Sequence, residues 1–217
     1  MVDFATLRTV MVDTQVRPSD VTRLTVIDAM LHVRREVFVP AEKRDVAYAE
    51  GEIPLRPGRS VPDPRVLAKM LDVLDPGPED LVLDIGCGSG YSTAVIGHMA
   101  EAVIAVEEDQ ALAAEAEENL SAESVDNAVV VNAPLAGGAE RHGPYDAVFI
   151  GGAVEILPDA IAGQLKEGGR IIAIFMQGVS GQCRLGVKAG DRIAWRAVFD
   201  AGAQVLPGFE RKRGFTL

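Results

Sequence analysis

A glycine-rich turn at residues 86–90 constrains the fold of this chain more than any other segment. Glycine occupies every second position of the turn, which directly follows the apolar run at residues 81–85 and precedes the start of a predicted helix. Because glycine lacks a Cβ atom and accepts positive φ, the backbone of such a turn can pass close to a ligand. The following helix offers free N–H groups to polar ligand atoms. The pattern predicts a strand, a ligand-binding turn and a helix.

Further apolar runs of strand length predict a sheet. They are continuous rather than alternating with polar residues, as is typical of strands covered on both faces. Helical stretches separate them, and this alternation predicts an α/β fold with a Rossmann-like, doubly wound, mostly parallel sheet and helices on both sides. Residues 182–205 predict strands joined by turns, and therefore an antiparallel C-terminal edge. The predicted core strands are residues 81–83, 103–106, 129–131, 147–150 and 171–174.

The N-terminal part of the chain has a different character. Residues 1–40 carry apolar positions at roughly the helical period and predict a helical preface. Residues 47–64 contain so many proline and glycine residues that they predict a long loop, and such loops inside a compact domain are usually functional. A helix is predicted over residues 64–74, before a turn rich in proline and glycine.

Length and charge limit the functions open to the chain. With 217 residues and 48% hydrophobic content, it can bury one sizeable core, so we expect a single domain over residues 1–217. Residues 1–75 would form the preface and active-site loop, and residues 76–217 the cofactor-binding core. The net charge of -11 argues against nucleic-acid partners, because binding to them requires basic side chains that neutralise phosphates.

Other signals point away from membranes and metals. The chain begins without the apolar core of a secretory signal, and no apolar run approaches the ~20 residues of a membrane-spanning helix. We therefore expect a cytoplasmic protein with no membrane partner. Cys87 and Cys183 are too far apart to predict a disulfide framework or a metal site. His32, His98 and His142 are also distant in sequence and are interpreted as surface or packing residues.

An acidic residue ends the second predicted core strand. Glu107 lies about twenty residues beyond the turn, where a carboxylate can accept hydrogen bonds from both hydroxyls of a ribose. Turn and carboxylate together predict a nucleoside ligand. The dinucleotide fingerprint is Gly-x-Gly-x-x-Gly, whereas this chain has Gly-x-Gly-x-Gly preceded by Asp84. Since a carboxylate there suits an ammonium and a sulfonium better than a pyrophosphate, S-adenosylmethionine, with S-adenosylhomocysteine as product, is favoured over a nicotinamide cofactor and an oxidoreductase.

Four segments carry a family resemblance: residues 34–40, 84–94, 144–147 and 164–170. From Val33 onward the sequence resembles the protein-L-isoaspartate O-methyltransferases, a family of class I methyltransferases that repair damaged aspartyl linkages. The resemblance implies methyl transfer to an isoaspartyl carboxylate of a protein or peptide. Such an acceptor is already ionised at neutral pH, so positioning rather than a strong base would drive the reaction.

Two segments depart from the family pattern. The family's active-site loop reads Gly-x-Thr-Ile-Ser-x-Pro, and residues 58–64 of this chain keep a hydroxyl at Ser60 but have Pro62 at the position of the family's serine. Asp63 is a candidate to replace the lost polar group. After the third core strand, Asn132-Ala133-Pro134 stands where the family has an acidic residue near the adenine. A catalytically impaired relative that binds the nucleoside, or a protein partner, in a regulatory role is the alternative.

The turn, the two strand ends and the proline-rich loop together contain the predicted site residues. The predicted catalytic residues are Ser60, Pro62 and Asp63, and the predicted cofactor-binding residues are Ser60, Asp84, Gly86, Cys87, Gly88, Ser89, Gly90, Glu107, Glu108, Asn132 and Ala133.

Overall fold

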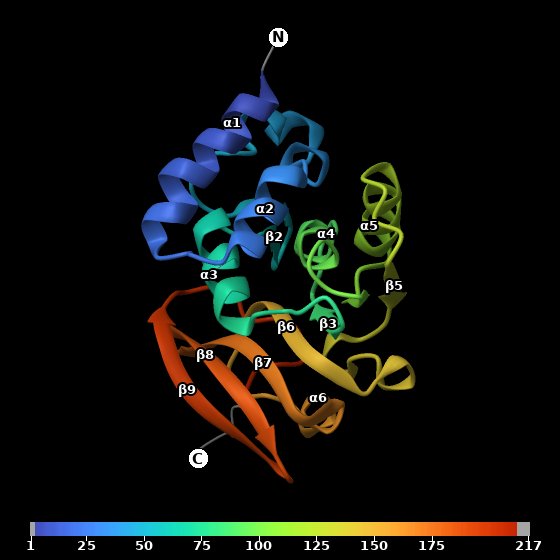
Figure 1. The fold of residues 1–217 in the computed structure, drawn as a ribbon. Helices are drawn as coiled ribbons and strands as arrows, with labels where there is room; N and C mark the ends of the chain where they lie inside the picture. The colour runs from blue at the N-terminus through green and yellow to red at the C-terminus, as the bar shows by residue number, and fades with distance from the viewer. Residues whose placement is uncertain (1–2, 212–217) are drawn as a thin grey trace, which may run out of the picture.

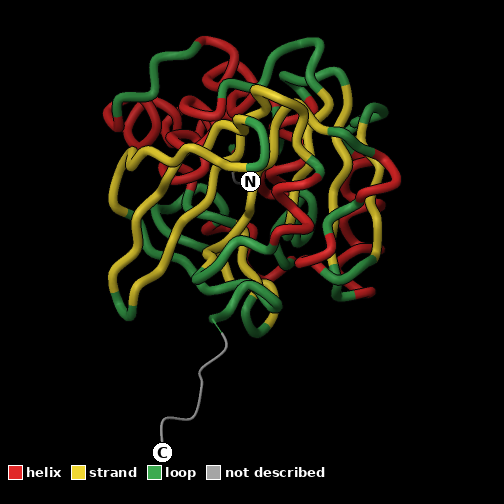
Figure 2. The backbone as a smooth tube through the Cα atoms, turned by 90° about the horizontal axis from the view of Figure 1, so that it is seen from below, coloured by secondary structure: helices red, strands yellow, loops and turns green. Residues whose placement is uncertain are grey.

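The computed structural model describes residues 3–211, which are built around one large sheet (Figure 1). Its strands are β3 (Leu81–Ile85), β4 (Ala102–Glu107), β5 (Ala128–Asn132), β6 (Tyr145–Val154), β7 (Leu165–Gln177), β8 (Ser180–Ala189) and β9 (Arg192–Asp200). Their order is β5-β4-β3-β6-β7-β8-β9, with β3 to β7 parallel and β8 and β9 antiparallel. The predicted parallel core and antiparallel C-terminal edge are confirmed, and β8 and β9 form a long hairpin at one side of the molecule (Figure 2).

The order of the strands reverses between β3 and β6. The chain runs from β3 through β4 to β5 in one direction and then returns to the other side of β3 to form β6 and β7. In open α/β sheets, ligands bind outside the carboxyl ends of the strands at such a switch point. The two strand ends approach closely there, since a Cβ on Gly151 would lie 2.8 Å from the carbonyl oxygen of Gly86. The glycine-rich turn therefore lies at the switch point.

Helices cover the two faces of the sheet unequally. The predicted helix α3 (Pro64–Leu74) is confirmed, and it shares one face with α4 (Tyr91–Gly97) and α5 (Gln110–Ala122). The other face is covered by the short α6 (Asp159–Gly163), 3-10 turns and the C-terminal segment that buries Leu206. The predicted alternation fails between β5 and β6, because the proline and glycine residues of 134–144 allow only 3-10 turns.

The predicted helical preface is confirmed from Phe4 onward, with short breaks between its helical segments; residues 1 and 2 lie outside the described part. It contains α1 (Phe4–Met11), a π-helical stretch (Val12–Val16), a 3-10 turn (Arg17–Ser19) and α2 (Leu24–His32). The break before α2 occurs at Asp20, whose φ of 63 lies in the left-handed region that Asp tolerates better than most residues. Two 3-10 segments follow, Arg35–Val37 and Ala41–Val46. Between residues 3 and 211, no helix combines the length and apolar character needed to cross a bilayer.

The prediction of an irregular loop over residues 47–64 is wrong in its middle. β1 (Ile53–Arg56) and β2 (Arg59–Val61) pair there as a short antiparallel hairpin, called here the 53–61 hairpin. Its turn uses Gly58, with a φ of 76, and Pro54 is tolerated because a two-stranded ribbon has free edges. Prolines and glycines that exclude a helix are thus compatible with this hairpin.

Candidate cofactor and active site

The glycine-rich turn connects β3 to α4 and is held by the end of β4. The N–H of Gly86 donates to the carbonyl of Val106 at 2.8 Å. Gly86, Gly88 and Gly90 have φ values of 82, 57 and 98. Side chains strongly disfavour this region, which explains why glycine occupies all three positions.

Glu107, at the end of β4, is fully buried beside this turn. Its carboxylate accepts hydrogen bonds from the N–H groups of Gly88 at 2.9 Å and Asp109 at 3.1 Å. It also forms an ion pair with Arg59 of the 53–61 hairpin, whose side chain is buried as well. The carboxylate that the sequence predicts to hold a ribose therefore already has a cationic partner from the chain itself.

Side chains of the hairpin and of the C-terminal segment fill the space over the turn. A Cβ on Gly88 would lie 3.0 Å from Leu55 Cδ1, and one on Gly86 would lie 3.1 Å from Leu206 Cδ1 and 3.2 Å from Arg59 Nη1. The cavity lined by Arg59, Leu206 and the end of β6 measures about 30 Å³, room for one or two water molecules. A ligand that accepts the Glu107 carboxylate as its partner would therefore compete with Arg59 of the hairpin.

Asp84 provides a second buried carboxylate, two residues before Gly86. Its Oδ2 accepts hydrogen bonds from the hydroxyls of Ser92 and Thr93, both at 2.7 Å. Its Oδ1 is buried and has no partner among residues 3–211. Burial raises the pKa of Asp84 to about 6, against the opposing effect of the two hydrogen bonds. A buried carboxylate oxygen without a donor fits a cationic ligand group, such as the ammonium of S-adenosylmethionine.

The raised pKa of Asp84 predicts an unusual pH dependence of stability. The unfolded chain releases this proton first, near the ordinary pKa of 3.8, and the folded protein near 6, so Asp84 makes the fold less stable as pH rises between these values. Two pKa units correspond to about 3 kcal/mol. Replacing Asp84 with Asn removes this effect, so the free energy of unfolding of the variant relative to wild type should rise by about that amount from about pH 4 to pH 7.

Chemical denaturation of both proteins across this pH range measures the difference. Asp126→Asn, at an exposed carboxylate, is the matched control and should follow wild type. Parallel profiles for Asp84→Asn and wild type would show that Asp84 is not a strained buried acid.

Ser89 and Cys87, the two residues between the glycines of the turn, are both buried. Ser89 donates from its hydroxyl to the carbonyl of Phe38 at 2.6 Å, which ties the turn to the segment after the helical preface. Cys87 is buried, and its burial raises the pKa of the thiol well above the ordinary value. A protonated, enclosed thiol is a poor nucleophile, which argues against a nucleophilic role for Cys87.

The predicted adenine-side residues lie next to Glu107 at the same edge of the sheet. Asn132 is directly opposite Glu107 in the pairing of β4 and β5. Its side-chain amide donates to the backbone carbonyls of Glu107 at 2.9 Å and Glu108 at 3.1 Å. The N–H of Ala133 donates to the carbonyl of Glu107 at 3.2 Å, and the Glu108 side chain is exposed. The glycine-rich turn, Glu107 and Asn132 thus lie together because the adjacent parallel strands β3, β4 and β5 end on the same side of the sheet.

The three predicted catalytic residues have different surroundings. Ser60 donates to the carboxylate of Glu52 at 3.0 Å, and both Ser60 and Pro62 line the small cavity beside the turn. Asp63 instead caps α3, where one oxygen accepts from the N–H of Arg65 at 2.8 Å and the other from the N–H of Gly51 at 3.0 Å. Both oxygens of Asp63 are therefore engaged in holding the backbone.

Two arginines of the site were missed by the sequence argument. Arg35 is fully buried, donates to the carbonyls of Ala47 at 2.7 Å and Pro62 at 2.9 Å, and lies over the ring of Tyr91. The sequence signal that could have identified Arg35 is its position close to the apolar segment 37–39. Arg59 stands 48 positions from Glu107, and no local pattern connects them. Only the folded hairpin does so.

The switch point, the glycine-rich turn and buried Glu107 define a class of protein, the class I S-adenosylmethionine-dependent methyltransferases. The sequence profile of the Protein-L-isoaspartate(D-aspartate) O-methyltransferase family (PCMT) matches residues 9–194. The chain belongs to this family.

Curated relatives agree with this assignment. Protein-L-isoaspartate O-methyltransferases of Methylorubrum populi and Koribacter versatilis are 36% and 34% identical to the chain. These alignments cover 79% and 78% of this chain, and 80% and 76% of the relatives. A third relative, from Pelotomaculum thermopropionicum, is 32% identical over 68% of this chain, and the match spans 65% of its own length.

Solved structures show the same fold. A protein-L-isoaspartate O-methyltransferase structure superposes with a TM-score of 0.80 at 20% identity, covering 95% of this chain and 66% of the other. A Plasmodium falciparum structure, described as a beta-aspartate methyltransferase in complex with S-adenosyl-L-homocysteine, has a TM-score of 0.77 at 20% identity and covers 95% of this chain and 99% of its own.

Proposed function

We propose that the protein transfers a methyl group from S-adenosylmethionine to the carboxylate of isoaspartyl residues in proteins or peptides. The observation that carries the proposal is the buried carboxylate of Glu107 next to the glycine-rich turn at the switch point, in a chain of the PCMT family. We further propose that the chain works as a single domain in the cytoplasm, with neither nucleic acid nor a membrane as partner.

We assign some residues of the site to cofactor binding and one to positioning of the acceptor. When bound, S-adenosylmethionine supplies a sulfonium methyl group that an acceptor carboxylate oxygen takes by in-line displacement, giving a methyl ester and S-adenosylhomocysteine. Glu107 would hold the ribose hydroxyls, Asp84 the ammonium, and Asn132 and Ala133 the adenine side. Ser60 would orient the acceptor, which is ionised at neutral pH and needs no general base.

The proposal is tested with purified protein, methyl-labelled S-adenosylmethionine and an isoaspartyl peptide. The matched control is the same peptide with a normal aspartyl residue. We expect label on the isoaspartyl peptide alone. Equal labelling of both peptides would refute the substrate assignment, and saturable cofactor binding without labelling of either would favour the non-catalytic alternative.

The non-catalytic alternative can be tested at Pro62, which stands where the family has a serine. A proline at this position supplies neither a hydroxyl nor a backbone N–H to an acceptor. We expect Pro62→Ser to raise kcat with the isoaspartyl peptide by about tenfold or more, because a positioning group is restored close to the acceptor. Steady-state kinetics check this against Pro78→Ser, an exposed proline outside the loop. An unchanged or lower kcat would mean that the loop of this chain positions its acceptor without that hydroxyl.

A further inference from the structure

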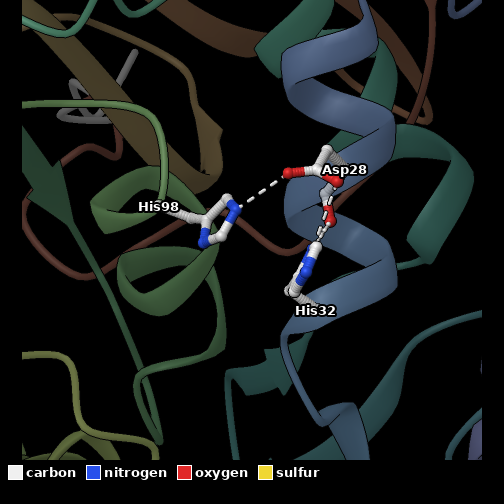
Figure 3. A group of neighbouring side chains, drawn as sticks. All are labelled: Asp28, His32 and His98. Atoms are coloured by element: carbon white, nitrogen blue, oxygen red, sulfur yellow. Dashed lines mark hydrogen bonds and ion pairs between the residues drawn. The ribbon is translucent and has the colours of Figure 1, made fainter.

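Two helices bring three potential metal ligands together outside the cofactor site. Asp28 and His32 lie one turn apart on α2, and His98 follows the last turn of α4 (Figure 3). His98 Nε2 lies 3.1 Å from Asp28 Oδ2. His32 Nδ1 lies 3.3 Å from Asp28 Oδ1 and 2.8 Å from the backbone carbonyl oxygen of Asp28. The two imidazole rings are stacked, with centroids 4.9 Å apart. Two of the three histidines of the chain, 66 positions apart in sequence, thus converge on one carboxylate.

We propose that Asp28, His32 and His98 bind a divalent transition-metal ion of the zinc type. Two imidazoles and one carboxylate form a ligand set that zinc accepts, with water in the fourth position. One donor atom from each residue already lies within 4.8 Å of the others. Bonds of about 2.0–2.2 Å require donors about 3–3.5 Å apart. Because these side chains are between 37% and 62% exposed, they can rotate about their own bonds to close the gap. His32 gives up its contact with the backbone carbonyl of Asp28 in doing so.

The neighbouring charged groups have other partners than the Asp28 carboxylate. Glu123, the other acidic group near the rings, is paired with Arg34 at 2.5 Å. Arg8 donates to the backbone carbonyl of His32 at 2.9 Å and so holds the end of α2. A hollow of about 320 Å³ beside both rings, lined also by Glu123 and Asn127, gives an ion and its water ligands access.

Such an ion would connect two parts of the fold. α2 belongs to the helical preface, and α4 begins directly after the glycine-rich turn. An ion that binds only the folded state raises thermal stability in proportion to the logarithm of its concentration. Zinc should therefore raise the Tm of the metal-free protein, whether or not the chain is an active methyltransferase.

The test is a titration of chelator-treated, full-length protein, prepared without a polyhistidine tag, with zinc chloride. Isothermal calorimetry gives stoichiometry and affinity, and thermal unfolding gives the shift in Tm. We expect one ion per chain, binding at least tenfold weaker in Asp28→Asn, His32→Gln and His98→Gln, and a smaller Tm shift in each variant. His142→Gln, at the third histidine, is the matched control and should bind as wild type does.

The substituted side chains are exposed, so the variants should fold, and circular dichroism before titration verifies this. Equal zinc affinity in all four variants and wild type, or only weak binding at several sites, would overturn the proposal. Loss of binding in His142→Gln as well would also overturn it, because the ion would then be held elsewhere.

Discussion

Arg59→Ala is expected to bind S-adenosylhomocysteine about tenfold to a hundredfold more tightly than wild type. In the free protein, Arg59 pairs with the buried carboxylate that the ribose needs, so cofactor binding must first break this pair. A charged hydrogen bond contributes about 1.5–3 kcal/mol, and every 1.4 kcal/mol is tenfold in affinity. Without Arg59 the carboxylate is free for the ligand. Isothermal titration calorimetry measures the change.

The hairpin provides its own control for this prediction. Arg56→Ala removes an exposed arginine of the same hairpin, which pairs loosely with Asp109 at 3.7 Å, and should leave the affinity close to that of wild type. Arg59→Ala should also lower the Tm of the ligand-free protein, because it leaves Glu107 buried without its cation. Unchanged or weaker ligand binding in Arg59→Ala would show that Arg59 does not compete with the cofactor.

Glu107→Gln is expected to weaken S-adenosylhomocysteine binding by at least tenfold to a hundredfold. The variant keeps the size of the side chain but loses the charge that accepts hydrogen bonds from both ribose hydroxyls. It also leaves the Arg59 guanidinium buried without a counter-ion, so the Tm should fall as well. Binding is therefore measured well below the Tm of the variant.

A double variant separates these two effects of Glu107→Gln. Adding Arg59→Ala removes the unpaired cation and should recover stability without recovering affinity. Glu118→Gln, on the exposed face of α5, controls for the loss of one negative charge. Full affinity in Glu107→Gln would mean that the ribose is held by another group.

Elements that depend on local pattern were predictable from the sequence. The five parallel strands, α3 and the antiparallel edge all follow from apolar runs and turn residues. The glycine spacing also identified the turn, because residues other than glycine rarely adopt the positive φ values found at its three glycine positions. Gly86 and Glu107 come together for a topological reason, since adjacent parallel strands end at the same edge.

Features that depend on long-range contacts were not predictable. The 53–61 hairpin has strands of only four and three residues, which give little periodicity, and its proline is more typical of a loop than of a strand. The pairing of Arg59 with Glu107 and the burial of Arg35 exist only once the hairpin folds over the sheet. Asp28, His32 and His98 converge only because α2 packs on α4. Sequence distance concealed each of these contacts.

The most direct test of this account is a crystal structure of the protein with S-adenosylhomocysteine. We expect the carboxylate of Glu107 to hold the ribose hydroxyls, with Arg59 displaced and the 53–61 hairpin moved away from the turn. A structure in which Arg59 still pairs with Glu107 while the nucleoside is bound elsewhere would contradict it.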